Sequence, residues 1–208
     1  MKPLLICDCD EVLLHMVRHF ADWLDRAHQI DFVLHNSEFG RAMRRRSDGM
    51  LVPQEQAWDY LGGFFTTEIH SQTPIPGAIE SIQALAKEAD IVILTNLIDD
   101  HRDRRIDQLA RHGLLHRVET NQGGKGHPVR RLMREHGDPV TVFVDDLAVH
   151  HQSVAEHAPL AHRLHLVGCH DVASTTLPAP HAHARIDRWD DALPWIRSRF
   201  AMGHAVPA

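Results

Sequence analysis

The chain has 208 residues, of which 43% are hydrophobic and 24% charged, a balance typical of a globular protein. Its length suits one core domain, or a core with a small insertion. The net charge of −6, with histidine counted as neutral, gives no support for a nucleic-acid partner. We find no basic leader, no apolar stretch of the roughly 20 residues that span a bilayer, and no disulfide framework among Cys7, Cys9 and Cys169. We therefore expect a soluble, cytoplasmic protein without a membrane or nucleic-acid partner, and the sequence leaves its oligomeric state open.

The first predicted element is an apolar strand at residues 3–9 that leads directly into closely spaced acids. Asp8 and Asp10 are separated by one residue, and Glu11 adds a third carboxylate. Crowded carboxylates repel one another and raise each other's pKa. A bound cation, or a chemical role, would explain why the sequence places these side chains together.

Further apolar runs along the chain are typical of β-strands. Several are continuously apolar, such as the run from Ile91 to Leu94, which indicates strands that are covered on both faces. Amphipathic stretches lie between the runs, and Gly113 and Gly137 mark two expected helix ends. Strands that alternate with helices predict an α/β fold with a mainly parallel sheet. The expected strands span residues 3–9, 91–95, 117–120, 140–144, 163–167 and 184–186.

The segment between the first two expected strands breaks this alternation. About 80 residues separate the two strands, far more than one crossover connection needs. Apolar spacing predicts one helix over residues 13–27, and two more around residues 37–47 and 53–65. The Pro/Gly-rich sequence of residues 72–80 then marks a return to the core. The expected domains are a core of residues 1–14 and 74–208, and a small α-helical insertion of residues 15–73.

Polar side chains follow several of the expected strands. Ligands of an open parallel sheet bind outside the carboxyl ends of its strands, so these side chains are candidates for one site. A lysine, Lys125, also lies in the Gly-rich loop of residues 121–126, and it is one of only three lysines in a chain that otherwise uses arginine. The residues expected to meet at this edge are Asp8, Asp10, Thr95, Asn96, Lys125, Asp145 and Asp146.

These residue types suit a magnesium ion and a phosphoryl group. Mg²⁺ prefers oxygen ligands, and a dication would relieve the repulsion within the two acid pairs. Lysine is a compact point charge that fits a tight phosphate pocket, so Lys125 would hold a phosphoryl group together with Thr95 and Asn96. A neighbouring carboxylate can then act as a nucleophile and form an aspartyl-phosphate. The expected metal ligands are Asp8, Asp10, Asp145 and Asp146.

The order of these motifs resembles that of the haloacid-dehalogenase-like (HAD) hydrolase superfamily. The matching segments are D-C-D-E-V at residues 8–12, L-T-N at 94–96, Lys125, and V-D-D at 144–146. The resemblance extends from Met1 to about Trp195. It implies a Rossmann-like, doubly wound core, dependence on Mg²⁺, and a cap inserted after the first motif.

The resemblance also implies a role for each motif residue. The first aspartate of the family pattern is the nucleophile, and the aspartate two residues later is the general acid and base. The threonine of the second motif binds the phosphoryl group, the third motif supplies a lysine, and the fourth supplies acids. The corresponding residues of this chain are Asp8, Asp10, Thr95, Lys125, Asp145 and Asp146.

Asp10 distinguishes among the chemistries of the family. As the resemblance implies, phosphatases and phosphotransferases keep an acid at this position to protonate the leaving group, whereas members that act on carbon–halogen or carbon–phosphorus bonds generally lack it. Members of the latter kind also use a cap lysine, and residues 15–73 contain none. The resemblance therefore implies a Mg²⁺-dependent phosphatase that hydrolyses a small phosphate monoester.

The same residues leave three alternative functions open. A phosphotransferase or mutase would use the same intermediate, and a non-catalytic member of the family would bind a phosphorylated ligand without turnover. A signalling receiver uses similar residues, but its acid pair comes first and its lysine last, whereas here Lys125 precedes Asp145 and Asp146. The partner common to the enzymatic functions is a small phosphorylated substrate.

Two positions depart from the family pattern. Glu11 stands where glycine or threonine is common, and it either narrows substrate choice or points to solvent. The fourth motif often carries an acid or asparagine four or five residues later, where this chain has Val149 and His150. Asp146 would then be the second acid that matters.

The insertion contains a basic and an aromatic group of residues. The basic group is a solvated helix face or a grip on a second anionic part of the substrate. The aromatic group is the core of the insertion or a stacking platform. The basic residues are Arg41, Arg44, Arg45 and Arg46, and the aromatic residues are Trp58, Tyr60, Phe64 and Phe65.

Overall fold

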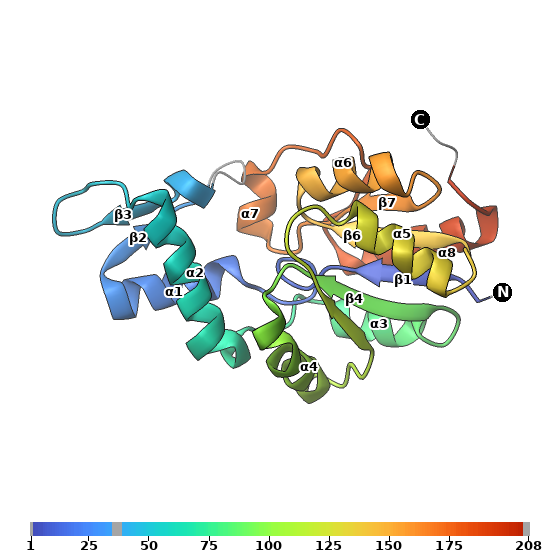
Figure 1. Cartoon of the computed structure of the whole chain (residues 1–208), viewed down its shortest axis with the longest axis horizontal. Helices are drawn as coiled ribbons and strands as arrows, with labels where there is room; N and C mark the ends of the chain where they lie inside the picture. Colours follow the sequence, from blue (N-terminus) through green and yellow to red (C-terminus); the bar gives the residue numbers. More distant parts are fainter. Residues whose placement is uncertain (1, 35–38, 206–208) are drawn as a thin grey trace.

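Six parallel strands form the central sheet in the part of the chain that the computed structural model describes, residues 2–34 and 39–205 (Figure 1). Each strand corresponds to one of the expected strands, which confirms the α/β fold. The central strand is apolar and fully buried along its length, as expected for a strand covered on both faces. The strands are β1 (Leu4–Cys7), β4 (Asp90–Thr95), β5 (Arg117–Thr120), β6 (Thr141–Asp145), β7 (His162–His165) and β8 (Ala184–Arg185).

The strands lie in the order β5-β4-β1-β6-β7-β8. The chain runs from β1 outward through β4 and β5, and then returns to the other side of β1 and continues through β6 to β8. The order therefore reverses beside β1, and open α/β sheets bind their ligands at such a point. In this register Cys7 pairs with Ile93 of β4 and with Val144 of β6. The carboxyl ends of these strands consequently lie at one edge of the sheet.

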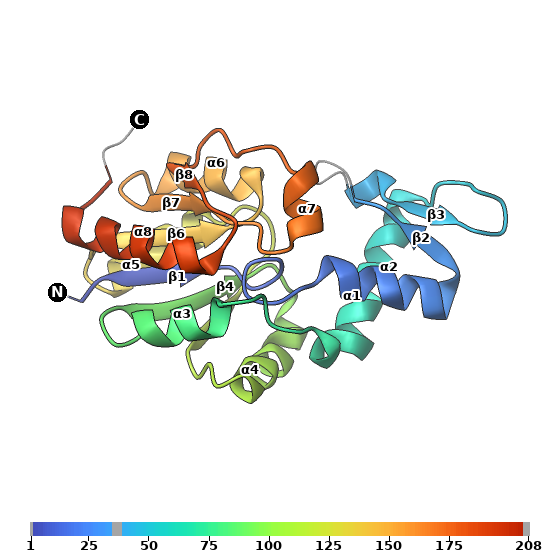
Figure 2. The same ribbon diagram turned by 180° about the vertical axis from the view of Figure 1, so that it is seen from behind.

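Helices cover both faces of the sheet. The side chains of β1 alternate, so that Leu5 and Cys7 pack into one apolar cluster and Leu4 and Ile6 into the other. The first cluster includes residues of α3 (Ala78–Leu85), α4 (Arg102–Arg111) and α8 (Trp189–Met202), and the second includes residues of α5 (Gly126–Glu135) and α6 (Ala148–His157). Helix α5 lies in front of the sheet in Figure 1, and α8 and α3 lie in front in the reversed view of Figure 2. Within the described ranges, no helix is long and apolar enough to cross a membrane.

The segment between β1 and β4 forms a smaller unit beside the sheet, which we call the cap (Figure 1). Phe20 lies at the centre of its separate apolar cluster, where its ring contacts the rings of Trp23, Phe32 and Phe64. Almost all residues of this cluster belong to the inserted segment, so the segment packs around apolar side chains of its own. The elements are α1 (Val17–Trp23), a π-helical turn (Leu24–His28), β2 (Ile30–Phe32), a 3₁₀ turn (Phe39–Arg41), β3 (Met43–Arg45), α2 (Gln54–Glu68) and a 3₁₀ turn (Ile69–Ser71).

The prediction of a helix over residues 37–47 is wrong where the structure describes it, from residue 39 onward; residues 37 and 38 lie outside the described part. Strand β3 occupies this segment and pairs antiparallel with β2. Met43 is buried and Arg44 exposed, an alternation that suits a strand on the cap core. Arg46 then forms ion pairs with Asp25 and Asp31, which lie before and in β2. The cap therefore contains a hairpin besides the expected helices.

The first cap helix also begins later than expected, at Val17 instead of residue 13. The chain makes a tight turn after β1, in which the amides of Leu13 and Leu14 both donate to the carbonyl oxygen of Cys9. Apolar spacing alone does not separate this turn from the helix that follows, because its leucines are as buried as those of a helix.

Candidate active site

Lys125 lies at the N-terminus of α5, and its fully buried side chain connects two acids. Its Nζ is 2.7 Å from Asp8 Oδ1 and 2.7 Å from Asp145 Oδ2. Burial opposes the charge of this ammonium group, but the two carboxylates outweigh burial and hold the pKa of Lys125 above its ordinary value. The expected convergence of the first motif, the lysine and the fourth motif is therefore present in the structure.

The two acids respond differently to burial. Burial raises the pKa of Asp8 to about 7, although Lys125 opposes the shift. Asp145 is buried even more deeply, and burial opposes its charge, yet the charge and hydrogen bond of Lys125 hold its pKa below the ordinary value. Asp145 also accepts a hydrogen bond from the amide of Leu147 at 2.9 Å. Asp145 is therefore held as a carboxylate in the free protein. The pKa of Asp8, in contrast, lies close to neutral pH.

Asp146 faces the pocket and completes a group of three carboxylates. Oxygen atoms of Asp8, Asp145 and Asp146 lie within 4.8 Å of one another. Burial, together with the charges of Asp145 and Asp8, raises the pKa of Asp146 well above its ordinary value. Three crowded carboxylates suit a hard divalent cation, because Mg²⁺ takes oxygen ligands and would neutralise this repulsion. The residues therefore fit the magnesium ion that the motif order implies.

Thr95 is the last residue of β4, and its hydroxyl has an unusual environment. The side chain is fully buried, and Oγ1 has no hydrogen-bond partner in the part of the chain that the structure describes. A buried hydroxyl without a partner costs about 1–3 kcal/mol, so such a group often serves a ligand. The next residue, Asn96, is exposed and donates to the carbonyl oxygen of Gly123 at 3.0 Å. Asn96 thus connects the end of β4 to the loop that carries Lys125.

Asp10 lies beside this group but is held by residues that the sequence analysis did not identify. Its two carboxylate oxygens accept hydrogen bonds from one terminal nitrogen of Arg105 at 2.9 and 2.8 Å. Gln72 also donates to Oδ1 at 2.7 Å. Arg105 lies on α4 and is completely buried, and it donates to Gln108 at 2.8 Å as well. The carboxylate of Asp10 does not belong to the group of three, so its role as a metal ligand stays a prediction.

Glu11 points inward, so the alternative that it faces solvent is not supported. Only 2% of the residue is exposed, and Oε1 accepts hydrogen bonds from the amides of Met16 and Val17 at 2.7 and 2.6 Å. Its backbone has φ of 58°, a left-handed conformation that is uncommon outside glycine. Burial raises the pKa of Glu11 to about 7 against the opposing effect of these amides. The side chain thus fixes the point at which the chain enters the cap.

A pocket of about 310 Å³ lies between this acidic edge and the cap. Its floor carries Asp8, Asp10 and Asp146, and its walls are mainly apolar. No lysine or arginine occurs among the described residues that line it. The apolar wall residues are Met16, Val17, Leu34, Phe39, Trp58, Leu61, Phe65, Leu147 and Val172.

The aromatic and the basic residues of the cap lie in different surroundings. Phe64 is fully buried in the cap core, whereas Trp58 is 51% exposed and lines the pocket, where it stacks on Phe39. The aromatic group therefore contributes both to the cap core and to the pocket wall. On the hairpin, Arg45 pairs with Asp48, and neither residue lines the pocket. The geometry thus gives no support for a grip by the basic group on a second anion.

His150 is a pocket residue that sequence reasoning did not select. It stands where the fourth motif often has an acid or asparagine, it is 4% exposed, and it lines the pocket. Its Nε2 lies 3.4 Å from Nδ2 of Asn96. Burial lowers the pKa of His150 below its ordinary value, although Asp145 opposes the shift. The sequence did place His150 five residues after Asp145, where the fourth motif often has a polar residue. Histidine is not the residue type that the family pattern has there, so the position was not selected.

Comparison with models of known families and with curated proteins finds no match. Several solved structures have the same fold. A haloacid dehalogenase-like hydrolase from Burkholderia xenovorans LB400 is 16% identical, with a TM-score of 0.63 over 95% of this chain and 98% of that one. A protein from Haemophilus somnus, named as a predicted phosphoglycolate phosphatase, is 14% identical, with a TM-score of 0.60 over 93% and 97%. A 2-haloacid dehalogenase from Pseudomonas syringae is 17% identical, with a TM-score of 0.57 over 96% and 100%.

Identities this low establish the fold alone. The chain has the Rossmann-like α/β fold of the HAD-like hydrolases, as the order of its motifs predicted. The neighbours include proteins named for phosphate-ester and for carbon–halogen chemistry, so the fold by itself does not choose between the two reactions. That choice depends on the residues of the site.

Proposed function

We propose that this protein is a HAD-like hydrolase that removes the phosphoryl group from a small phosphate monoester through an aspartyl-phosphate on Asp8. The observation that supports this most directly is the buried Lys125, which lies 2.7 Å from both Asp8 and Asp145 beneath an acid-lined pocket. A lysine buried between two carboxylates, next to an unpartnered hydroxyl on Thr95, suits a site built for a phosphoryl group.

In the proposed first step, the carboxylate oxygen of Asp8 that is not bound to Lys125 attacks phosphorus. A bond forms between this oxygen and phosphorus, and the ester P–O bond breaks. Asp10 enters this step as the carboxylic acid and gives its proton to the leaving alkoxide, and the water of the second step returns a proton to it. Lys125 orients Asp8 and stabilises the charge on the phosphoryl oxygens, and the Thr95 hydroxyl donates a hydrogen bond to one of them.

In the second step, Asp10 accepts a proton from a water molecule that attacks the phosphorus of the aspartyl-phosphate. The bond between Asp8 and phosphorus breaks, and inorganic phosphate leaves as the carboxylate is restored. Asp8, Asp145 and Asp146 would hold the Mg²⁺ ion, which when bound neutralises charge on the phosphoryl oxygens.

Asp10 favours phosphate-ester chemistry over dehalogenation. It lines the pocket two residues after the proposed nucleophile, where it can protonate an alkoxide. A halide leaving group needs no proton, and the cap segment of residues 15–73 offers no lysine. The ion pair with Arg105 means that Asp10 must turn away from the guanidinium to reach a leaving group.

The apolar pocket wall suggests the kind of ester. A sugar phosphate or a phospho-acid presents hydroxyl or carboxylate groups, which an apolar wall would leave without partners. An aromatic or aliphatic leaving group would instead pack on Phe39, Trp58 and Phe65. We therefore propose a phosphate ester of a largely apolar alcohol or phenol as the substrate.

The test is a release assay for inorganic phosphate with and without Mg²⁺, over aryl and alkyl phosphates, sugar phosphates, phospho-acids and nucleotides. We expect turnover only with a divalent cation, a preference for aryl phosphates of about tenfold or more in kcat/KM, and a loss of at least about 10³-fold in Asp8→Asn. Phosphate appearing on a second sugar instead of in solution would identify a phosphotransferase or mutase. Full activity of Asp8→Asn would refute the mechanism.

A non-catalytic protein would give a distinct result in the same assay. It would bind inorganic phosphate or an aryl phosphate without releasing phosphate, and binding would persist in Asp8→Asn. Release of halide from 2-haloacids by the wild type, together with inactivity on all phosphate esters, would instead assign the protein to carbon–halogen chemistry.

A further inference from the structure

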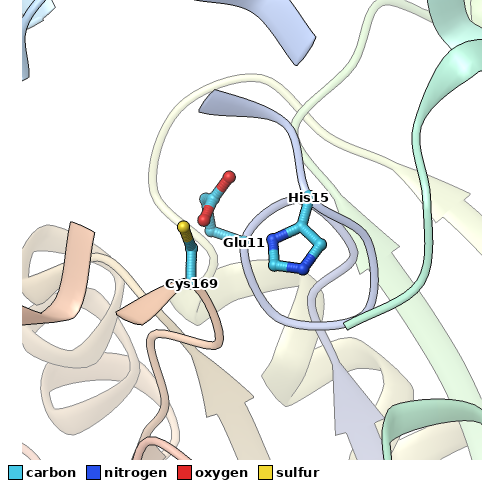
Figure 3. A group of neighbouring side chains, drawn as sticks. All are labelled: Glu11, His15 and Cys169. Atoms are coloured by element: carbon cyan, nitrogen blue, oxygen red, sulfur yellow. The ribbon is translucent and has the colours of Figure 1, made fainter. Parts of the chain in front are cut away.

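A second group of ligand-type side chains lies next to the proposed active site. Figure 3 shows Glu11, His15 and Cys169, whose side chains point toward one another. One ligand atom from each residue lies within 4.8 Å of the other two. Glu11 lies in the loop after β1, His15 in the connection to the cap, and Cys169 directly before α7 (His170–Thr175). Two segments that are far apart in the sequence, residues 11–15 and the segment directly before α7, therefore bring a carboxylate, an imidazole and a thiol close together.

Two polar atoms in this group are buried without a partner. Oε2 of Glu11 and Nδ1 of His15 have no hydrogen-bond partner among the described residues. The two residues are 2% and 7% exposed, and Cys169 is 8% exposed. In Figure 3 a ring nitrogen of His15 faces the Glu11 side chain. Each orphaned polar atom costs about 1–3 kcal/mol, so two of them within one group of ligand-type side chains indicate a ligand that both would bind.

We propose that Glu11, His15 and Cys169 bind a zinc ion, at a site separate from the three carboxylates of the proposed active site. Zinc takes thiolate, imidazole and carboxylate ligands together, whereas Mg²⁺ takes oxygen ligands and does not use a thiol. Tetrahedral zinc bonds of about 2.0–2.3 Å place neighbouring ligand atoms roughly 3.3–3.8 Å apart, so a contraction of about 1 Å would close the site. On binding, the thiol of Cys169 transfers its proton to the buffer.

The pocket below the cap adjoins this group, because Glu11 is one of the residues that line it. We expect an ion to enter from the pocket and a water molecule to supply the fourth ligand. Oε1 of Glu11 is already used by the amides of Met16 and Val17, which leaves Oε2 for the ion.

A bound ion would connect the core to the cap. His15 lies two residues before α1, and Cys169 packs with Val172 and Val17 in a small apolar cluster between the cap and α7. The ion would thus join the loop after β1, the first cap connection and the segment before α7. Zinc should therefore raise the midpoint of thermal unfolding, because the assembled site binds it more tightly than the separate side chains of the unfolded chain do.

The test uses Co²⁺ as a spectroscopic probe for zinc, with Mg²⁺ in excess to occupy the carboxylate site. We expect a thiolate-to-cobalt charge-transfer band that saturates at about one equivalent and disappears when Zn²⁺ is added. Cys169→Ser should abolish the band, and His15→Gln, which keeps all the thiols, should weaken cobalt binding at least about tenfold. Cys7→Ala is the matched control, because Cys7 is a buried thiol outside the group and its loss should leave the band unchanged.

Absence of the band in the wild type, or its persistence in Cys169→Ser, would overturn the assignment. Cobalt bound without a thiolate band would also overturn it, since the chain has 19 histidines that could bind the ion instead. Circular dichroism of each variant checks that it folds. The measurement needs no substrate, so it stands or fails independently of the proposed phosphatase activity.

Discussion

At the scale of single residues, Thr95 allows an effect on stability to be distinguished from an effect on ligand binding. Its buried hydroxyl makes no hydrogen bond among the described residues, so Thr95→Val removes no interaction from the free protein. We expect this variant to be as stable as the wild type, or more stable by up to about 1 kcal/mol. We expect kcat/KM for the best phosphate ester to fall by about 10²–10³-fold, because one donor to the phosphoryl group is lost.

The matched control is Thr95→Ser, which keeps the hydroxyl and deletes one buried methyl group. It should lose about 1 kcal/mol of stability and retain most of the activity. Urea unfolding and steady-state kinetics measure the two properties separately. Unchanged kinetics in Thr95→Val would show that this hydroxyl does not contact the substrate.

The ion pair of Asp10 and Arg105 gives the proposed acid a structural role as well. Arg105 is fully buried, so Asp10→Asn leaves a guanidinium without its carboxylate and should cost about 2–3 kcal/mol of stability, since Asp10 itself is partly exposed. Arg105→Met made together with Asp10→Asn should recover part of this loss. A double-mutant cycle of urea unfolding should therefore give a coupling energy above about 1 kcal/mol.

An exposed ion pair on the same helix serves as the control for this cycle. Arg111 and Asp107 lie 3.2 Å apart with side chains 61% and 67% exposed. Their coupling energy should be below about 0.5 kcal/mol. Equal coupling in the two cycles would show that burial does not strengthen the pair of Asp10 and Arg105.

Arg105 also illustrates a limit of sequence reasoning. It lies in the run H-R-D-R-R-I-D, where Arg102, Arg104 and Arg105 all have the pattern of ordinary surface residues on an amphipathic helix. Only the packing of α4 against the core and the cap buries Arg105, and its partner Asp10 is 95 residues away along the chain. In contrast, Asp8, Thr95 and Asp145 could be selected because each follows or ends a strongly apolar strand, and parallel strands end at one edge.

At the scale of elements, the close packing of the start of α5 against α6 requires a glycine at position 126. A Cβ on Gly126 would lie 2.0 Å from the backbone oxygen of Ser153 on α6. Gly126→Ala must therefore push α5 away from α6, and we expect a loss of about 3 kcal/mol of stability. Because Lys125 directly precedes Gly126, the shift also disturbs its contacts with Asp8, and activity should fall. Thermal unfolding and phosphate release measure the two effects.

Gly62→Ala is the control for this substitution. Gly62 lies inside α2, and a Cβ there would meet nothing within 4 Å. Alanine is the better helix former, so this variant should gain about 0.5–1 kcal/mol. A stable, active Gly126→Ala would show that the two helices adjust without cost.

The elements of the core were more predictable than those of the cap. The core strands are continuously apolar because helices cover both faces, and their short length between turn residues distinguishes them from buried helices. In the cap, the hairpin of β2 and β3 is short, and its arginine-rich strand has the composition of a solvated helix. The ion pairs of Arg46 with Asp25 and Asp31, which connect the end of β3 to the π-helical turn and β2, exist only after the chain has folded back.

At the scale of the whole molecule, buried histidines make stability depend on pH. His15, His151 and His183 each have a pKa lowered to about 4, chiefly because burial disfavours the charged ring. In the unfolded chain these histidines take up protons below about pH 6.5, whereas in the folded chain they stay neutral until the pH approaches 4. The stability that they contribute is therefore present above about pH 6.5 and is lost as the pH falls toward 4.

His183 allows this effect to be measured away from the pocket. Its Nδ1 accepts a hydrogen bond from the amide of Arg163 at 2.9 Å. Asparagine offers an acceptor at a similar position and does not titrate in this range. Urea unfolding measures how far the free energy of unfolding falls when the pH is lowered from about 7.5 to about 5. We expect this fall to be about 1 kcal/mol smaller in His183→Asn than in the wild type.

Asp8 and Glu11 act in the opposite direction, because burial raises their pKa to about 7. Their contribution to stability is present at low pH and is lost as the pH rises toward 7. The comparison of His183→Asn with the wild type cancels this contribution, since both proteins contain the two acids. Identical pH dependence of the two proteins would show that His183 is not held neutral by the fold.

The position of Trp58 gives the molecule an optical signal for occupancy. Trp58 is 51% exposed at the pocket wall, whereas Trp189 is fully buried in the core and Trp23 is 9% exposed. The fourth tryptophan, Trp195, is partly buried and does not line the pocket. Water around an indole ring shifts its fluorescence to longer wavelengths. A compound that fills the pocket would displace this water and shift the emission of Trp58 toward the blue, while the emission of the other three indoles, which do not line the pocket, stays constant. Titrations of unlabelled protein can thus rank candidate compounds before any reaction is known.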